Sequence, residues 1–171
     1  MTALDANPET AIGRAMFDEL LYIHGALRAD LITVERLAGE VGAGLPASEV
    51  RSEIDNLQTQ SPVWQLKVNC RMYCRFVHLH HRMEDVAFFP RLREANPALS
   101  PVIDRLESDH RVVSTLLDEV ERAASAMSDG CDDTARRRVV DALTGLATQL
   151  LEHLQYEERE AGPTIRRMTA F

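Results

Sequence analysis

Four segments of the chain repeat apolar residues at alternating steps of three and four, and each segment has a histidine within its apolar line. A spacing of about 3.5 residues is typical of helices that pack side by side in a bundle. The first line reads Phe17, Leu20, His24, Leu27, Leu31, Val34 and Ala38. The other three lines contain His80, His110 and His153. No segment sustains the period-two alternation of a strand, so the pattern predicts an all-α fold.

Capping residues, glycines and prolines set the expected ends of the helices. The first helix should begin at Asn7, a good N-cap, with Pro8 in its first turn, and end at Gly42. The others are expected from Ser61-Pro62 to Pro90 or soon after, from Ser100-Pro101 to a loop at 128–130, and from Asp132 or Asp133 to Gly162-Pro163. Residues 42–61 should form a short extra helix in the long connection. We therefore predict one domain over 1–171, an antiparallel four-helix bundle with its core at about 7–163.

Charge and hydropathy exclude several classes of partner. The chain has 27 acidic and 19 basic residues, and its net charge of −8 argues against binding nucleic acid or an anionic membrane surface. It has no apolar run long enough to span a bilayer and no recognisable secretory signal. Its three cysteines, Cys70, Cys74 and Cys131, are expected to be reduced thiols. These features predict a cytoplasmic protein.

Two of the four histidines have a glutamate four residues later, as His80 with Glu84 and His153 with Glu157. Residues four apart on a helix differ by only about 40°, so each pair can direct an imidazole and a carboxylate at one point. A single histidine on an apolar face is more often a hydrogen-bonded core residue. Four of them on separate helices, with two buried carboxylates that need partners, favour metal instead. The donor types suit two iron ions bridged by the glutamates and a water-derived oxygen. The predicted ligands are His24, His80, Glu84, His110, His153 and Glu157.

The neighbours of these positions leave two roles open for His81. It lies about 100° from His80 around the helix and flanks Glu84 on the other side, so it can be a seventh ligand or can donate a hydrogen bond to one. His78 points away from the apolar line and is expected to face solvent. Asp85, about 100° from Glu84, is expected to be exposed as well.

Three other side chains are candidates for contact with the site. Tyr73 and Tyr156 can line the cavity or place a phenol beside the metals, although packing is the simpler role for both. Glu107 stands three residues before His110, which matches the Glu-x-x-His spacing of ferritin-like di-iron sites. That motif occurs once here instead of twice, so Glu107 is expected to be at most a partner of a ligand.

In these residues and their order, the chain resembles the hemerythrin-like family and its His-His-Glu cation-binding domains. The segments that carry the resemblance are the lone His24, His80-His81 with Glu84-Asp85 before Phe88-Phe89-Pro90, Asp109-His110, and His153 with Glu157-Glu158. Their order and spacing cover most of the chain from Asn7 to about Pro163. The resemblance implies a non-haem di-iron centre within a four-helix bundle. Members of the family bind oxygen, sense oxygen or iron, or react with peroxide and nitric oxide.

The resemblance assigns the ligand roles to the same six positions, and His81 matches a position where some relatives have an added carboxylate ligand. Two features differ from the oxygen-carrying members. Ser114 stands four residues after His110, where the carriers have a second histidine, and the fourth helix has His-x3-Glu instead of His-x4-Asp. Fewer imidazoles favour redox chemistry over reversible oxygen storage.

We therefore expect a di-iron protein that binds or reacts with O2 or H2O2, and its enzymatic form would disproportionate peroxide in a catalase-like reaction. The alternative is a module that senses oxygen, nitric oxide or iron without turnover.

Overall fold

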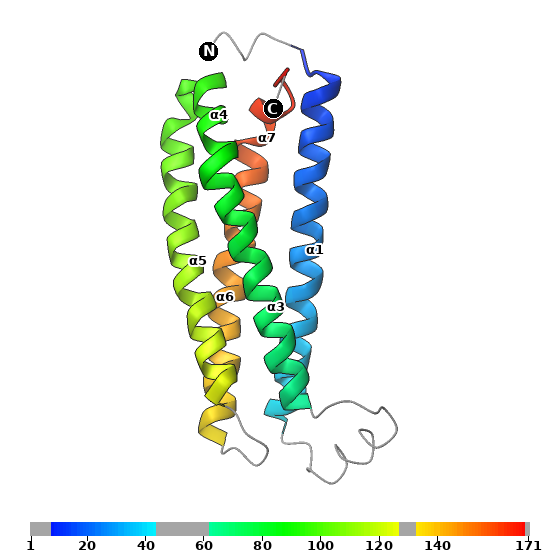
Figure 1. Cartoon of the computed structure of the whole chain (residues 1–171), viewed down its shortest axis with the longest axis vertical. Helices are drawn as coiled ribbons and strands as arrows, with labels where there is room; N and C mark the ends of the chain where they lie inside the picture. Colours follow the sequence, from blue (N-terminus) through cyan, green and yellow to red (C-terminus); the bar gives the residue numbers. More distant parts are fainter. Residues whose placement is uncertain (1–7, 44–61, 127–132, 170–171) are drawn as a thin grey trace.

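The computed structural model describes residues 8–43, 62–126 and 133–169, and within these ranges the side chains at 37, 38, 41 and 62–72 are left undescribed. Four long helices run alternately up and down (Figure 1): α1 (Ala11–Gly42), α3 (Pro62–Met83), α5 (Ser100–Ala126) and α6 (Asp133–Glu160). Each packs against two neighbours, in the order α1, α3, α5, α6 and back to α1. The predicted antiparallel four-helix bundle is confirmed. The predictions for Asn7, the extra helix within 42–61, the loop at 128–130, Cys131 and the side chain of Cys70 lie outside the described residues.

The first helix begins later than predicted. Residues 8–10 are not helical, and Thr10 caps the helix by accepting a hydrogen bond at Oγ1 from the backbone N–H of Gly13, at 2.8 Å. The short helix α7 (Gly162–Ile165) and the turn after it cross this end of α1. The backbone N–H of Thr10 donates to the carbonyl of Arg166 at 2.9 Å. A Cβ at Gly13 would lie 2.3 Å from that oxygen, so only glycine allows this close approach. Pro8 therefore lies before the helix, contrary to the prediction.

The helix that contains α3 continues past Pro90, although it was expected to end there or soon after. A π-helical segment, η1 (Glu84–Phe88), follows α3, and α4 (Phe89–Ala95) then continues to a short 3₁₀ turn, η2 (Pro97–Leu99). The backbone N–H of Phe89 donates to the carbonyl of Glu84, five residues earlier. Pro90 then falls in the first turn of α4, where a missing N–H costs little. The π turn thus allows the helix to continue past Pro90 without a break.

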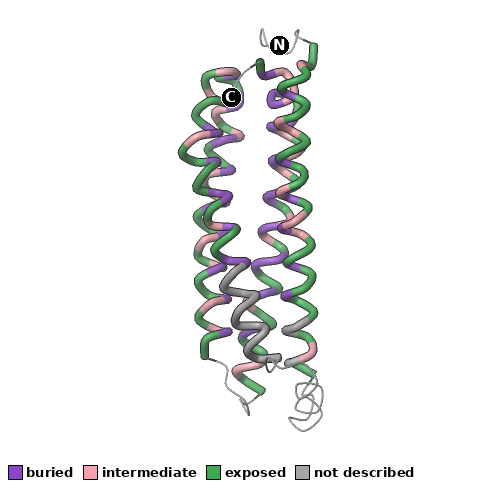
Figure 2. Tube along the Cα trace, turned by 45° about the vertical axis from the view of Figure 1, so that its right-hand side comes forward, coloured by how far each residue is buried: buried purple, intermediate pink, exposed green. Residues whose placement is uncertain are grey.

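Among the described residues, the apolar side chains of the interior form two clusters, and the inward faces of the helices are buried (Figure 2). One cluster, toward the α1–α3 connection, includes Leu27, Leu31, Val77, Val113, Leu117, Leu143 and Leu150. The other, toward the chain termini, includes Leu20, Phe89, Leu92, Ile103, Leu106 and Ile165. His24 falls between Leu20 and Leu27, and His110 between Leu106 and Val113. The predicted histidines therefore form a polar layer between two apolar regions. None of the described helices is long and apolar enough to cross a membrane.

Candidate metal centre

The polar layer brings the six predicted ligands and His81 together. His24 comes from α1, His80 and His81 from the end of α3, Glu84 from the start of η1, His110 from α5, and His153 and Glu157 from α6. All seven side chains are buried, with at most 8% of the residue surface exposed. A helical bundle reaches one interior point from several helices in this way, so no loop is needed to build the site.

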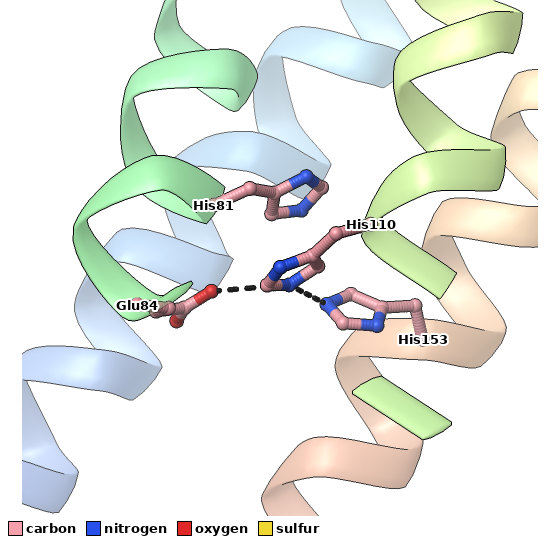
Figure 3. A group of neighbouring side chains, drawn as sticks. All are labelled: His81, Glu84, His110 and His153. Carbon is pink, nitrogen blue, oxygen red and sulfur yellow. Dashed lines mark hydrogen bonds and ion pairs between the residues drawn. The ribbon is translucent and has the colours of Figure 1, made fainter. Parts of the chain in front are cut away.

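These side chains form two groups whose donor atoms lie within 4.8 Å of one another. We call the first the His81 cluster, which consists of His81, Glu84, His110 and His153. The second, the His24 cluster, consists of His24, His80, Glu84 and Glu157. Figure 3 shows the His81 cluster, in which imidazoles from α3, α5 and α6 converge with the carboxylate of Glu84. Glu84 belongs to both groups, whereas Glu157 belongs to one.

The two oxygens of Glu84 face different clusters. Its Oε1 lies 3.2 Å from Nε2 of His80, and its Oε2 lies 3.4 Å from Nε2 of His110. A carboxylate can contact two metal ions through its two oxygens, whereas an imidazole nitrogen can bind only one. The orientation of Glu84 is thus the one that a shared ligand needs.

Other donor atoms within each cluster also lie close together. In the His24 cluster, Nε2 of His24 lies 3.4 Å from Oε2 of Glu157. In the His81 cluster, the Nε2 atoms of His110 and His153 are 3.1 Å apart. The rings of His81 and His110 stack with their centres 3.9 Å apart. His81, whose role the sequence left open, therefore lies among the potential ligands and not on the outer surface.

Burial keeps the imidazoles of His80, His81, His110 and His153 neutral. It lowers the pKa of His80 to about 4 and that of His110 to about 2, and the neighbouring imidazoles add to both shifts. The pKa values of His81 and His153 are lowered mainly by burial too. Neutral imidazoles keep a nitrogen lone pair free for a metal ion at physiological pH.

The two glutamates differ in their ionisation. Burial and the nearby carboxylate of Glu157 raise the pKa of Glu84 well above its usual value. Burial alone would also raise the pKa of Glu157, but the contact with His24 and the other nearby imidazoles outweigh it and lower the pKa. Two carboxylates this close need a positive charge between them to be ionised together, which a metal ion would supply.

Hydrogen bonding provides a direct test of whether these residues fit a metal. Nine buried side-chain nitrogen and oxygen atoms in the described part of the chain have no hydrogen-bond partner, and eight of them belong to the two clusters. They include both oxygens of Glu84 and both of Glu157. Each such atom costs about 1–3 kcal/mol when it is buried without a partner. Imidazole nitrogens and carboxylate oxygens at one point suit a first-row transition metal, so the residues fit.

Acidic side chains outside the clusters contact the far side of the imidazole rings, which sequence reasoning missed. Nδ1 of His24 lies 2.8 Å from Oε1 of Glu158, which also accepts a hydrogen bond from Arg28 at 2.8 Å. Nδ1 of His110 lies 2.7 Å from Oδ1 of Asp85. A carboxylate at Nδ1 favours the tautomer that carries its proton there and leaves Nε2 free for metal.

A third contact of this kind is longer. Oδ2 of Asp109 lies 3.9 Å from Nδ1 of His153, which is ion-pair range without a hydrogen bond. All three acids stand next to a predicted ligand in the sequence but contact a histidine on the neighbouring helix. That adjacency was the available signal. Asp85 is indeed partly exposed, as predicted, yet it also contacts the site.

Tyr73 and Tyr156 belong to neither the His81 cluster nor the His24 cluster. Tyr73 is buried in the apolar core, its hydroxyl has no hydrogen-bond partner, and burial raises its pKa. Tyr156 is half-buried, and the guanidinium of Arg105 stacks on its ring, 3.8 Å from the ring centre. These placements agree with the packing role that the sequence favoured for both.

The other two neighbours also lie apart from the clusters. Glu107 accepts a hydrogen bond from Arg93 at 3.0 Å and is in neither group. Nε2 of His78 lies 3.9 Å from a carboxylate oxygen of Asp118, and the His78 side chain is 39% exposed. His78 thus faces away from the site, as predicted.

Comparison with known proteins agrees with this geometry. A family model described as the hemerythrin HHE cation-binding domain matches residues 15–165, a range that contains every residue of both clusters. Neither the curated proteins nor the solved structures gave a significant match. The match covers most of the chain, and the clusters within it are suited to metal binding. The chain therefore belongs to the hemerythrin family of HHE cation-binding domains.

Proposed function

We propose that this chain is a cytoplasmic non-haem di-iron protein that binds or reacts with O2 or H2O2, and that it consumes peroxide by disproportionation. The observation that carries the proposal is the position of Glu84, whose two oxygens face two separate clusters of donors. One shared carboxylate between two groups of imidazoles is the arrangement that a pair of metal ions requires.

The donor set favours iron over the common alternatives. A structural zinc ion prefers four ligands, commonly with thiolates, and neither cluster contains a cysteine. Magnesium and calcium prefer oxygen donors, whereas five of the seven cluster residues are histidines. Mixed imidazole and carboxylate donors suit iron, which in two neighbouring ions can supply or accept electrons for a small oxidant. His24, His80, Glu84 and Glu157 would hold one ion, and His81, Glu84, His110 and His153 the other.

The remaining residues prepare the site for this chemistry. Glu158 and Asp85 hold the rings of His24 and His110 and favour the tautomer with a free Nε2. The two apolar clusters on either side of the polar layer limit the access of bulk water. Burial of the candidate metal ligands strengthens the electrostatic attraction between their carboxylates and a cation.

Oxygen release from peroxide tests the proposal. Iron-loaded chain should convert two H2O2 into one O2 and two H2O over many turnovers, as measured with an oxygen electrode. The metal-free chain and Glu84→Ala should not, whereas His78→Ala should behave like the unchanged protein. A stable coloured adduct without turnover would contradict the enzymatic part and indicate a binding or sensing module. An iron-loaded chain that gives no reaction with O2 or peroxide would contradict the whole proposal.

A further inference from the structure

A groove of about 660 Å³ lies between α1 and the α3–η1 segment and leads to the metal centre. The α1 side is lined by Ile12, Ala15, Met16, Glu19, Leu20 and Ile23. The opposite side is lined by His80, Met83, Glu84 and Phe88. Two of these residues, His80 and Glu84, belong to the His24 cluster, so one end of the groove is a wall of the site. Its volume is in the usual range for a small-molecule site, about 300–1,000 Å³.

The walls of the groove are apolar even where they meet water. Ile12 is 51% exposed and Met83 is 58% exposed, and both line it. Met16, Leu20 and Phe88 continue the apolar surface inward. Large apolar side chains around a concave surface are typical of a site for an organic molecule, because the ligand removes their surface from water. A hydrocarbon of several carbon atoms would be needed to cover them, which neither O2 nor H2O2 provides.

The groove is polar where it meets the metal centre. Glu84 is 4% exposed, and neither of its oxygens nor Nε2 of His80 has a hydrogen-bond partner among the described residues. Glu19, which also lines the groove, is exposed, and the described lining contains no lysine or arginine. An anionic head group would therefore lose its hydration without gaining a basic side chain as a partner. A ligand that fits therefore has an uncharged polar end and an apolar body.

We propose that this groove binds an uncharged organic molecule with a hydrocarbon chain and a hydroxyl or hydroperoxyl end. Alkyl hydroperoxides (ROOH) are then the substrate class of the centre, and two ROOH give two ROH and one O2 in the same disproportionation that is proposed for H2O2. The hydrocarbon lies along Met16, Leu20 and Met83, and the polar end lies at His80 and Glu84. The assignment of a substrate rests on the proposed function, whereas the assignment of a binding site rests on the groove alone.

Binding of 1-octanol, a stable stand-in for an alkyl hydroperoxide, tests the site in the full chain as purified. Titration calorimetry should show saturable binding at one site per chain. Octanoate has the same chain length but an anionic end. In the metal-free chain it should bind at least about tenfold more weakly, because the described lining has no lysine or arginine to pair with its carboxylate. Absence of saturable octanol binding would overturn the proposal, and equal binding of octanoate would overturn the uncharged end.

Substitutions test whether octanol binds in this groove. Ala15→Phe fills the groove from α1 and should abolish octanol binding, whereas Ala29→Phe, on an exposed part of the same helix outside the groove, should leave it unchanged. Met83→Gln keeps the side-chain length and removes apolar surface, so it should weaken binding by up to about tenfold. Leu79→Gln is the matched control, because Leu79 is also 58% exposed but does not line the groove. Equal effects of a variant and its control would overturn the location.

The outcomes for the groove and for the centre are separate. Octanol binding does not depend on peroxide chemistry, and oxygen release from H2O2 does not need the groove. Peroxide turnover without octanol binding would overturn the groove alone. If the iron-loaded chain binds octanol but does not react with O2 or peroxide, the binding site stands. The assignment of hydroperoxides as its substrates is then overturned.

Discussion

The two clusters of the centre share Glu84 but differ in charge. The His24 cluster has two imidazoles and two carboxylates, whereas the His81 cluster has three imidazoles and one carboxylate. With both carboxylates ionised, the His24 cluster offers a cation about twice the negative charge that the His81 cluster offers. Nearby negative charge strengthens the binding of a buried cation. The two metal positions are therefore expected to be unequal, with the His24 cluster the tighter one.

The largest effect should come from the residue that both clusters share. Glu84→Ala removes a donor from each group and the carboxylate between the two cations, so iron content should fall close to zero. Metal analysis of the purified variant measures this, with circular dichroism to verify the fold. Retention of the full iron content would show that Glu84 is not a ligand.

Removing one histidine from each cluster should separate the two positions. His81→Ala and His24→Ala should each lose about half of the iron, because each removes a donor from one cluster only. The iron that remains in His81→Ala should be held more tightly, since it lies in the cluster with two carboxylates. Chelator competition compares the two variants. Equal affinity of the remaining iron would contradict the inequality of the clusters.

The acids at the far side of the rings should tune affinity without changing stoichiometry. Glu158→Gln and Asp85→Asn keep the side-chain shape but lose the charge beside Nδ1 of His24 and His110, respectively. Loss of such a partner typically weakens metal binding by about 10–100-fold. Titration with iron in the presence of a chelator would show whether each variant weakens mainly its own cluster. A loss of stoichiometry instead would indicate that these acids bind metal directly.

Acidification should destabilise the metal-free chain. His80 and His110 have folded-state pKa values of about 4 and about 2 against an ordinary value of 6.5, so the unfolded chain binds more protons below about pH 6.5. Each such imidazole costs up to about 2 kcal/mol at pH 5. The raised pKa of Glu84 acts in the opposite direction, but one carboxyl opposes several imidazoles. The Tm should therefore be lower at pH 5 than at pH 7. An equal or higher Tm at pH 5 would contradict the conclusion that burial keeps these imidazoles neutral.

The smallest effect is expected at a histidine outside both clusters. His78→Ala should leave iron content, affinity and Tm nearly unchanged, because His78 faces Asp118 at the surface. Metal analysis beside His81→Ala makes the comparison, since the two residues are three apart on the same helix. A marked loss of iron in His78→Ala would mean that the end of α3 is rotated so that His78 faces the metal centre.

Periodicity and residue type predicted the parts of this molecule that depend on one helix at a time. The apolar lines gave the helices, and His80 with Glu84 marked the inner face of α3 because four residues nearly complete a turn. The start of α1 was misplaced because Asn7-Pro8 and Thr10 are both good capping sequences, and the tertiary contact of Thr10 with Arg166 decides between them. The passage of the helix through Pro90 depends on the π turn, which no spacing rule indicates.

Contacts between helices were beyond sequence reasoning for a different reason. Whether Glu158 reaches His24 depends on the relative height and rotation of α1 and α6, which the pattern of either helix leaves open. The same holds for Asp85 and His110, and for the groove between α1 and α3. The ligand residues could be predicted because they share inward faces. Their division into two clusters needed the structure.

Anaerobic titration of the metal-free chain with ferrous iron shows whether this layer holds two iron ions. Saturation is expected at two equivalents per chain, in two steps of unequal affinity, with Glu84→Ala binding neither. Saturation at a single equivalent, or no binding above that of Glu84→Ala, would contradict it.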